Sequence, residues 1–367
     1  MKLELKKEGK IKFFVPAARK ITKKDEVFYN PEMEFDRDLS EIIVSILKPK
    51  KICDCLAASG VRGLRYKSVL DSAEVVANDK NPKASELIKE NAKLNKLEIR
   101  VENKDANVLL SEEKFDFIDI DPFGSPIYFL DSCARAIKNK GSVAITATDT
   151  APLCGTYSET CLRRYGIKSF RVDFAKELGL RILLSAVIKN FAKYDLSFKP
   201  LFSYYKRHYF RIFGSVEQGA KKVDKLLEEF DYLSYCERCG WRKKGIFEKC
   251  GFCGSKVILI QNLYLGNFAQ KEFCNKILEK LGCKTMIDKV LPPRVKESGT
   301  HPSVLIRAVR DEQGYPPYYE IHRLCKLNKK QPKKMEVLLE KLEARRTHFS
   351  PLGIKTKKEF SEIIKCL

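Results

Sequence analysis

The sequence predicts an α/β protein, with a parallel sheet covered by helices in the first part of the chain and a smaller α+β domain in the second. Three observations lead to this prediction. Residues 50–148 alternate β-like and helix-like runs, the 367 residues exceed the usual size of one domain, and two Cys-x2-Cys pairs lie close together in the second part. In such a sheet, ligands bind beyond the carboxyl ends of the strands.

The elements of the first part follow from their apolar periodicity. Short apolar or alternating runs predict strands, which span 50–58, 73–79, 99–106, 114–121 and 141–150. Apolar residues at helical spacing predict helices between them, which span 59–70, 81–97 and 127–139. The pair Asn81-Pro82 is typical of a helix start, because Asn caps the helix and Pro fits its first turn.

A long helix-like stretch, 172–194, comes next and is followed by two adjacent strands within 196–216. We place the domain boundary near Gly219, which gives domains of residues 1–218 and 219–367. The second domain contains the cysteine-rich segment, an amphipathic helix near 276–281 and a basic helix over 333–346.

The charge of the chain points to its partner. Seventy Lys and Arg residues oppose 48 Asp and Glu residues, so the formal net charge is +22. Such a charge favours a polyanion, and RNA or DNA is the first hypothesis. A basic proteome or an acidic membrane surface would also explain the charge.

The 13 cysteines and the N-terminus indicate the compartment. The stretch MKLELKKEGKIKFF lacks the apolar core of a signal peptide, and no run reaches membrane-spanning length. A reducing, cytoplasmic location is therefore expected, with free thiols and metal ligands rather than disulfides. No feature indicates a membrane or an obligate protein partner.

Three strand ends carry residues suited to a nucleoside ligand. The turn after the first strand, DCLAASGVRG, has small residues that let its backbone approach a ligand, although it is not a G-x-G-x-x-G and a ligand-free turn is an equal alternative. Asp79 ends the second strand, where an acid accepts hydrogen bonds from ribose hydroxyls. Asp105 ends the third, beside Ala106, where an acid and a backbone amide could read adenine. Each acid could instead be a solvated helix cap.

The stretch IDIDPFGSP, residues 118–126, places Asp121 at the end of the fourth strand before a rigid turn. An amino group conjugated with a ring is a poor nucleophile, so its chemistry needs an acceptor that orients its hydrogens. Asp121 and the carbonyl of Pro122 could do this, and Phe123 could stack on the base. Asp119 shares a strand face with Asp121 and is either a supporting acid or a salt-bridge partner.

Several motifs in the same order resemble a known family. DIDPFGSP, VFYNPEMEFDRD, LAASGVRGLR and ATDTAPLCG are similar to motifs of the tRNA (guanine-26-N2) dimethyltransferases, and the similarity continues to THFSPLGIKT near the C-terminus. The resemblance implies a class I, Rossmann-like methyltransferase fold. It also implies transfer of methyl groups from S-adenosyl-L-methionine to N2 of guanine 26 in tRNA, giving N2,N2-dimethylguanosine.

The resemblance also implies which residues hold the cofactor. These residues are Arg37, Arg62 or Arg65, Asp79, Asp105 and Ala106. An arginine suits the methionine carboxylate because the two groups form a bidentate pair, but spacing does not distinguish Arg62 from Arg65.

For the reacting groups, the resemblance implies that Phe28 and Phe123 flank them and that Asp121 is the catalytic acid or base. Without the family match, Phe28 would be interpreted as a core aromatic and Arg37 as a surface charge.

The segment CERCGWRKKGIFEKCGFCG predicts a zinc ribbon-like site. Cys236, Cys239, Cys250 and Cys253 form two Cys-x2-Cys pairs, and a glycine follows Cys239 and Cys253. Four thiolates match structural Zn2+ and leave no open position for catalysis. Redox thiols or an iron–sulfur cluster are the alternatives. Cys53 and Cys55, in an apolar strand, are expected to be small core residues.

Two stretches combine charges or rings in a way that suits RNA. YYKRHYFRIF, residues 204–213, interleaves basic and aromatic side chains, and residues 329–346 with the later KTKK are strongly basic. Core strand aromatics and a solvated helix face are the alternatives. His301 and His348 are expected in loops, where they could touch the substrate.

The predicted function is therefore methylation of an exocyclic amine on tRNA. Methylation of another RNA or DNA base, such as adenine N6, is the nearest alternative, because the Asp-Pro-Phe-Gly turn alone would permit it. A non-catalytic RNA-binding protein with a zinc ribbon is the alternative from a different class, and the acids at the strand ends argue against it.

Overall fold

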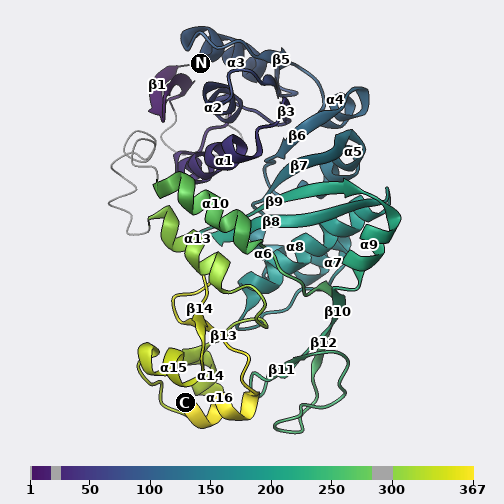
Figure 1. The fold of residues 1–367 in the computed structure, drawn as a ribbon, viewed down its shortest axis with the longest axis vertical. Coiled ribbons are helices and arrows are strands. Elements are labelled where there is room, and N and C mark those ends of the chain that lie inside the picture. The colour runs from purple at the N-terminus through teal and green to yellow at the C-terminus, as the bar shows by residue number, and fades with distance from the viewer. Residues whose placement is uncertain (1, 18–25, 283–300) are drawn as a thin grey trace. The chain divides into compact units, whose positions relative to one another are not determined.

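The computed structural model describes residues 2–17, 26–282 and 301–367 (Figure 1). The chain divides into two compact units, each built from separate segments. The first unit comprises Met1–Thr146, Phe213–Gln218 and Glu272–Ile306, and the second comprises Ala147–Ile212, Gly219–Lys271 and Arg307–Leu367. The domain boundary near Gly219 stays a prediction.

A seven-stranded sheet with the order β5-β4-β3-β6-β7-β9-β8 confirms the predicted α/β class. The strands from β5 to β7 run parallel. The seven strands are β3 (Lys51–Asp54), β4 (Glu74–Asn78), β5 (Arg100–Glu102), β6 (Phe115–Ile120), β7 (Ile137–Ala147), β8 (Leu196–Lys206) and β9 (Tyr209–Gln218). Because a parallel strand covered by helices is buried on both faces, β3 and β6 are almost entirely apolar or buried.

The α-helices between residues 34 and 136 differ in how they begin, and two of them have a side-chain cap. They are α1 (Glu34–Leu47), α2 (Val61–Val69), α3 (Pro82–Leu94), α4 (Ala106–Glu112) and α5 (Leu130–Ala136). Asn81 accepts the backbone N–H of Lys83 at the start of α3, and Asp105 accepts that of Asn107 at the start of α4. Gly60 precedes α2 with φ of 77°, a value that suits glycine.

The predicted helix over 127–139 is partly wrong. A 3-10 turn, Pro126–Phe129, comes first, α5 ends at Ala136, and β7 begins at Ile137. Ile137 pairs with Phe115 of β6, so sheet pairing takes over the residues that helical periodicity had assigned to the helix.

An N-terminal hairpin was not predicted. It consists of β1 (Leu3–Glu8) and β2 (Ile11–Pro16), which pair antiparallel. Three alternate residues of β2, Ile11, Phe13 and Val15, are buried in a cluster with Val61 and Leu64 of α2. The hairpin thereby places Glu8, at the end of β1, beside the charged residues of α1 and α2.

In the second unit, α8 (Ala175–Ala192) confirms the predicted long helix. The two adjacent strands are confirmed by β8, in the second unit, and by β9, whose residues from Phe213 on belong to the first unit. The second unit also contains α6 (Thr150–Leu153), α7 (Ser158–Tyr165), α9 (Ala220–Leu227) and a small sheet of β10 (Phe230–Tyr235), β11 (Arg242–Lys244) and β12 (Ile258–Tyr264). The predicted amphipathic helix lies within α10 (Lys271–Gly282).

The C-terminal elements are short. They are α13 (Pro302–Asp311), β13 (Tyr319–Glu320), α14 (Ile321–Leu327), α15 (Met335–Lys341), β14 (Arg345–Arg346), β15 (Gly353–Lys355) and α16 (Phe360–Cys366). The predicted basic helix over 333–346 is too long, because the chain turns at Glu343, whose φ is 47°. Arg345 and Arg346 instead pair with β15.

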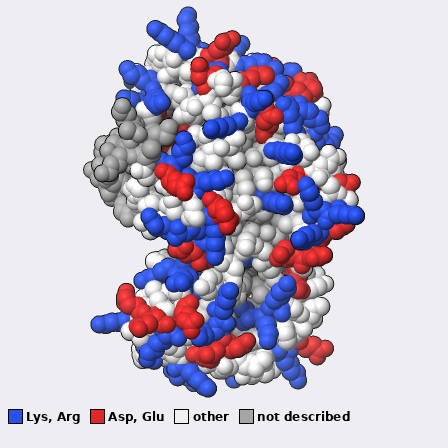
Figure 2. Space-filling view, in the orientation of Figure 1, with Lys and Arg blue, Asp and Glu red and all other residues white. Residues whose placement is uncertain are grey.

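Among the described residues, no helix is both long and apolar enough to cross a membrane. Figure 2 shows Lys and Arg side chains spread over the visible face, with Asp and Glu between them.

Candidate active site and metal centre

Asp121 follows directly after β6 and begins a tight turn. Pro122 is buried, Gly124 has φ of 95°, and the side-chain oxygen of Ser125 accepts the N–H of Ile127. The turn leaves the Phe123 side chain 52% exposed, while the Asp121 side chain is 22% exposed. The sequence motif therefore presents one carboxylate and one aromatic ring at the carboxyl end of a buried strand.

Arg62 of α2 is the cation that holds Asp121. Its Nη2 contacts Asp121 Oδ2 and lies 2.8 Å from Asp36 Oδ2 of α1. Its Nη1 lies 3.1 Å from Ser40 Oγ and 3.8 Å from Asp119 Oδ2. One buried guanidinium is thus shared by three carboxylates, of which only Asp121 reaches solvent to an appreciable extent.

The acids behind Asp121 are held in a different way. Tyr66 O–H donates to Asp119 Oδ2 at 2.5 Å, and Gly63 N–H donates to Asp54 Oδ2 at 2.9 Å. Burial raises the pKa of Asp54 to about 7, and the Asp119 charge adds to the shift. The pKa of Arg62 is raised well above its usual range, because the attraction of Asp119, Asp121 and Asp36 outweighs the opposing effect of its burial.

Arg37 and Arg65 form a second ion-pair group around Glu8. Glu8 Oε2 accepts from Arg37 Nε at 2.7 Å, and Glu8 Oε1 accepts from Arg37 Nη2 at 2.5 Å. Arg65 contacts Glu8, Asp38 and Glu41 at 2.5 to 3.1 Å and is 1% exposed. Burial alone would raise the pKa of Glu8, but the two guanidiniums bring it below its ordinary value. Burial raises the pKa of Asp38 to about 7.

Phe28 and Phe123 lie together, as their predicted shared role requires. Their ring centroids are 4.9 Å apart and the rings are nearly perpendicular, at 78°. Val27, next to Phe28, is buried against Ala84 and Leu87 of α3, which anchors this segment. The structure therefore brings together two aromatic residues that lie far apart in the sequence.

Asp79 closes the turn after β3. Its two carboxylate oxygens accept the backbone N–H groups of Ala58 and Asn81, both at 2.9 Å. Ala58 itself has a left-handed backbone, with φ of 47°. Asp79 is half-buried, so part of the carboxylate faces outward beyond β4.

Asp105 and Ala106 lie beyond β5. Asp105 is exposed and caps α4, while Ala106 is buried. The side-chain amide of Asn78 donates to the carbonyls of Cys55 and Lys104, both at 3.0 Å, and so ties the turn after β3 to the loop that carries Asp105.

Sequence reasoning missed the residues that hold the arginines in place. They are Glu8, Asp36, Asp38, Glu41 and Tyr66, and all are at most 4% exposed. The charged triplet Asp36-Arg37-Asp38 in a helix that ends in the apolar run IIVSIL was a usable signal, because charges at buried helix positions require partners. Glu8 had no such signal, since its hairpin was not predicted.

The four predicted metal ligands converge on one point. The sulfur atoms of Cys236, Cys239, Cys250 and Cys253 all lie within 4.8 Å of one another, and the shortest separations are 3.5 and 3.6 Å. Four sulfurs each about 2.3 Å from a tetrahedral Zn2+ lie about 3.8 Å apart, so these residues fit such an ion. The backbone N–H groups of Phe252 and Cys253 donate to Cys250 Sγ, which suits a thiolate.

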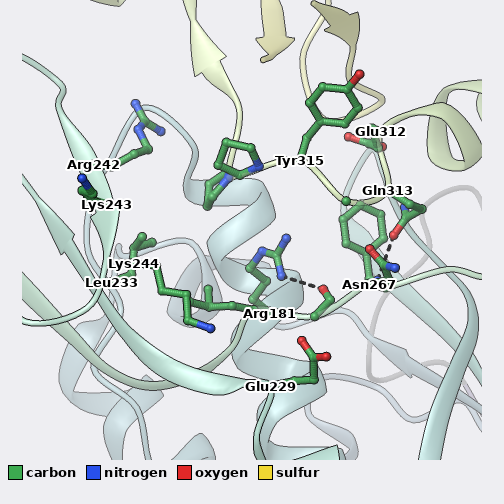
Figure 3. A pocket seen from close by; sticks show the side chains of 16 residues that line it. Arg181, Glu229, Leu233, Arg242, Lys243, Lys244, Asn267, Glu312, Gln313 and Tyr315 are labelled. Atoms are coloured by element: carbon green, nitrogen blue, oxygen red, sulfur yellow. Dashed lines mark hydrogen bonds between the residues drawn. The ribbon is translucent and has the colours of Figure 1, made fainter. Parts of the chain in front are cut away.

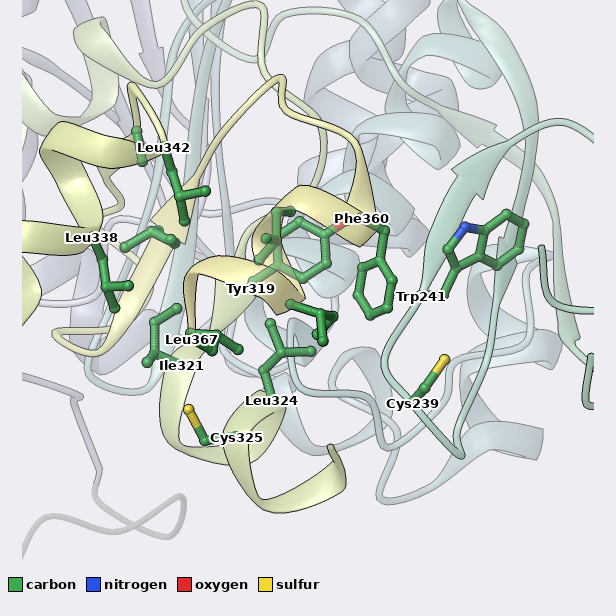
Figure 4. Close-up of a cluster of buried hydrophobic side chains, with 14 of the residues drawn as sticks. Cys239, Trp241, Tyr319, Ile321, Leu324, Cys325, Leu338, Leu342, Phe360 and Leu367 are labelled. Carbon is green, nitrogen blue, oxygen red and sulfur yellow. The ribbon is translucent and has the colours of Figure 1, made fainter. Parts of the chain in front are cut away.

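The cysteine site is packed against the C-terminal helices. Cys239 and Trp241 belong to a buried cluster with Leu324 of α14, Leu338 of α15 and Phe360 of α16 (Figure 4). Gly240 permits the close approach, because a Cβ there would lie 2.9 Å from Leu324 Cδ1. A metal ion held by these cysteines would therefore organise the core of the C-terminal segment as well as its own loops.

The stretch predicted to bind RNA through its rings is mostly core. Tyr204, Tyr209, Phe210 and Phe213 are fully buried, so the alternative of core strand aromatics is correct for them. Residues 205–208, at the turn between β8 and β9, are the ones that are half-buried or exposed.

His301 and His348 lie in loops, as predicted, but His348 is not positioned to touch a substrate. Its side chain is 1% exposed, its Nδ1 contacts Glu312 Oε1, and its Nε2 accepts the backbone N–H of Tyr205 at 3.1 Å. Cys53 and Cys55 are fully buried, as expected for core residues.

Comparison with known proteins adds independent findings. The family model described as N2,N2-dimethylguanosine tRNA methyltransferase matches residues 9–367. A tRNA (guanine(26)-N(2))-dimethyltransferase of Saccharolobus islandicus is 39% identical, and that of Saccharolobus solfataricus 40%; each alignment covers 100% of this chain and 99% of the relative. The corresponding protein of Methanopyrus kandleri is 39% identical over 82% of each chain.

Among solved structures, the complex of Trm1 from Pyrococcus horikoshii with S-adenosyl-L-methionine is similar over 99% of both chains. Its TM-score is 0.88 and its sequence identity to this chain is 32%.

Proposed function

Since this chain belongs to the N2,N2-dimethylguanosine tRNA methyltransferase family, we propose a reaction scheme for its residues. The enzyme is an S-adenosylmethionine-dependent tRNA (guanine(26)-N2)-dimethyltransferase, which agrees with the resemblance predicted from its motifs. The observation that carries the scheme is the Asp121–Gly124 turn, which presents a partly exposed carboxyl group and an exposed ring together.

Asp121 is proposed to accept hydrogen bonds from the N2 amine of guanine, together with the carbonyl of Pro122. For each methyl group transferred, an N–C bond forms, a C–S bond breaks and one N–H proton leaves. The Asp121 carboxylate can take that proton and pass it to water, because its side chain is partly exposed. Arg62 keeps the carboxylate oriented through the ion pair.

Phe28 and Phe123 are proposed to hold the base. A guanine inside an RNA helix cannot reach a turn at a sheet edge, so it must leave its stack. The exposed ring of Phe123 offers it a new stacking surface, and Phe28 supports that ring edge-on. Most of the rate enhancement then comes from proximity and orientation of the amine.

The cofactor is proposed to lie along the ends of β3, β4 and β5. When bound, S-adenosylmethionine supplies an electrophilic methyl group on a sulfonium sulfur. The outward part of Asp79 suits ribose hydroxyls, and Asp105 with the backbone of Ala106 suits the adenine edge. The small-residue turn before α2 leaves room for close backbone approach.

Two of the three candidate arginines are proposed to attract the methionine carboxylate. Arg62 and Arg37 carry this role, because Arg62 pairs with the partly exposed Asp121 and Arg37 lies near enough to Arg62 for their charges to interact. Arg65 is enclosed by Glu8, Asp38 and Glu41, so we assign it the structural role of joining α1, α2 and β1.

The four cysteines are proposed to bind one structural Zn2+. Their sulfur separations suit a tetrahedral site, and a structural Zn2+ needs no ligand beyond these four thiolates. Metal analysis of purified protein should give about one zinc per chain, and Cys250→Ser with Cys253→Ser should abolish it. None of the described cysteines forms a disulfide, which agrees with a reducing, cytoplasmic location.

The reaction is tested with an unmodified tRNA transcript that carries guanine at position 26. Mass spectrometry of its nucleosides after incubation with enzyme and methyl donor should show N2,N2-dimethylguanosine. A transcript with adenine at position 26 and a DNA substrate serve as controls and should remain unmodified. Methyl groups on adenine N6 would instead support the alternative substrate class, and no methylation of any nucleoside would contradict the proposed activity.

A further inference from the structure

One basic stretch of the second unit contains no acid. Between Glu320 and Glu336 the chain has no Asp or Glu, and residues 326–334, KLNKKQPKK, contain five lysines. We call residues 326–334 the lysine loop, which begins in the last turn of α14 and runs to the start of α15. All five of its lysines are exposed, namely Lys326, Lys329, Lys330, Lys333 and Lys334.

The charge of the lysine loop is not neutralised by the part of the chain that the structure describes. None of its lysines forms an ion pair with a described carboxylate, and the ammonium of Lys333 donates to the carbonyl of Cys366 at 2.7 Å. Like charges so close together repel one another, and an anion that carries several charges at short intervals relieves this repulsion. The lysine loop is therefore suited to a polyanion.

The arginines of a nearby part of the same unit are different. Figure 3 shows Arg181 and Arg242 in the lining of a pocket of about 350 Å³. Arg181 pairs with Glu177, and Arg242 pairs with Asp173. Because these charges are matched inside the protein, the pocket does not offer a phosphate what the lysine loop offers it.

The lysine loop is anchored on the cysteine site. The side-chain amide of Asn328 donates to the carbonyl of Cys239 at 2.8 Å. Leu324 of α14 and Leu338 of α15 lie in the buried cluster that includes Cys239 (Figure 4). The two helices that flank the loop are therefore fixed, so little backbone freedom is lost when the loop binds a ligand.

We propose that the lysine loop binds the phosphate backbone of the tRNA substrate. Lysines neutralise phosphates and release their counterions, and such contacts do not depend on the base sequence. This inference rests on the proposed function, because that function makes tRNA the polyanion in question. It also gives the cysteine site a task in substrate binding, which is to hold the lysine loop in place.

The first test measures tRNA binding by fluorescence anisotropy between about 50 and 200 mM salt. The triple variant Lys326→Gln, Lys330→Gln, Lys334→Gln should bind an unmodified transcript about tenfold more weakly and lower the salt slope by about two to three. The loss should be equal for transcripts with guanine and with adenine at position 26, because their phosphates are the same. Affinity for S-adenosylmethionine, measured by calorimetry, should stay constant.

The matched control removes three exposed lysines from α9 in the same unit. In Lys221→Gln, Lys222→Gln, Lys225→Gln the net charge falls by the same amount, but these lysines lie in a run that also contains Asp224 and two glutamates. This variant should bind tRNA within about twofold of the wild type, because acids already offset its lysines.

A second test separates binding from folding at Lys329. Its φ is 53°, and the N–H of Lys330 donates to the carbonyl of Cys325 at 2.9 Å, as at a helix end that favours glycine. Lys329→Gly should therefore raise the melting temperature by about 1 to 3 °C. It should nevertheless weaken tRNA binding about two- to threefold, because one phosphate contact is lost.

Lys96→Gly is the matched control for this variant. Lys96 follows α3 with φ of 55°, and the N–H of Leu97 donates to the carbonyl of Ala92 at 3.0 Å, so the backbone geometry is the same. The lysine is exposed but lies at the amino end of β5, away from the strand ends that carry the candidate active site. Its replacement should raise the melting temperature equally and leave tRNA binding unchanged.

Two outcomes would overturn the inference even if the wild type makes dimethylguanosine. One is a lysine-loop variant that binds tRNA as tightly as the wild type. The other is an equal loss of binding in the α9 variant, which would mean that net charge and not the lysine loop attracts tRNA. A wild type that methylates no nucleoside, while the lysine-loop variants still lose tRNA binding, would overturn the proposed reaction and leave the lysine loop as the tRNA contact.

Discussion

Each unit buries a cluster of charged side chains, but the two clusters differ in whether they reach solvent. In the second unit, Glu177, Arg181, Glu312, His348 and Lys355 contact one another, and each side chain is at most 3% exposed. In the first unit, the cluster around Arg62 ends at Asp121, whose side chain is 22% exposed.

This difference shows that buried charge alone does not mark an active site. In a closed cluster, every charged group is paired with another member, and the cluster contributes to the specificity of packing. In an open cluster, one charged group is accessible and can contact a substrate. Replacing a member of the open cluster should therefore affect chemistry, and replacing a member of the closed cluster should affect folding.

The largest effect on chemistry is expected from Asp121→Asn. The amide keeps the shape of the side chain but cannot accept a proton, so single-turnover methylation should fall by a factor of about 10² to 10⁴. Asp131→Asn, at an exposed position on α5, is the matched control and should retain wild-type rates. A variant that is folded and fully active would show that Asp121 is not the acceptor.

The closed cluster is tested with Lys355→Met. Lys355 is 0% exposed and lies 2.8 Å from Glu177 Oε1 and 3.4 Å from Glu312 Oε2, so its removal leaves Glu177 with Arg181 alone and Glu312 with His348 alone. The free energy of unfolding, from urea denaturation, should fall by about 3 to 5 kcal/mol. Lys365→Met, exposed on α16, is the control. Unchanged stability with altered affinity for S-adenosylmethionine would reverse the assignment of the two clusters.

The open cluster could be predicted in part, and the closed one could not. Asp121 was singled out because the carboxyl ends of parallel strands meet at one edge, a rule that depends on local periodicity alone. Glu8 reaches Arg37 only through a hairpin that periodicity did not reveal. Lys355 contacts Glu177, which lies 178 residues earlier in the chain, so local sequence patterns could not predict this pair. For Tyr204–Phe213 the alternatives of RNA contact and core strand aromatics stayed open for a related reason, since a pattern of rings and cations does not say which face is covered.

A smaller effect on chemistry is expected from Tyr66→Phe. The variant loses the O–H that donates to Asp119 at 2.5 Å, so Asp119 draws more strongly on Arg62 and weakens the ion pair with Asp121. The kcat should fall about three- to tenfold, because Arg62 then holds the Asp121 carboxyl group less firmly in place. The KM for the methyl donor should change little.

Tyr165→Phe is the matched control, because it removes an O–H that donates to Asp149 at 2.7 Å in the second unit. Its kcat should equal that of the wild type. If Tyr66→Phe lowers only the melting temperature and leaves kcat unchanged, Tyr66 supports the fold and not Asp121.

The smallest effect is a change in the pH dependence of stability with Asp54→Asn. Burial raises the folded pKa of Asp54 to about 7, against about 3.9 when unfolded. The folded state therefore binds this proton more tightly, so the stability that it contributes is complete below about pH 4 and is lost as the pH rises towards 7. Asparagine does not titrate, and its amide oxygen can still accept the N–H of Gly63.

Thermal melts of the wild type and of Asp54→Asn between pH 4.5 and 8.5 isolate the contribution of Asp54, because all other groups titrate equally in the two proteins. As the pH rises to 7, the melting temperature of the variant should increase by a few degrees relative to that of the wild type, and the difference should then stay constant. A difference that is the same at every pH would mean that Asp54 stays ionised throughout. The first cluster would then resemble the second, with every charge matched in the folded state, and solvent exposure of Asp121 alone would distinguish them.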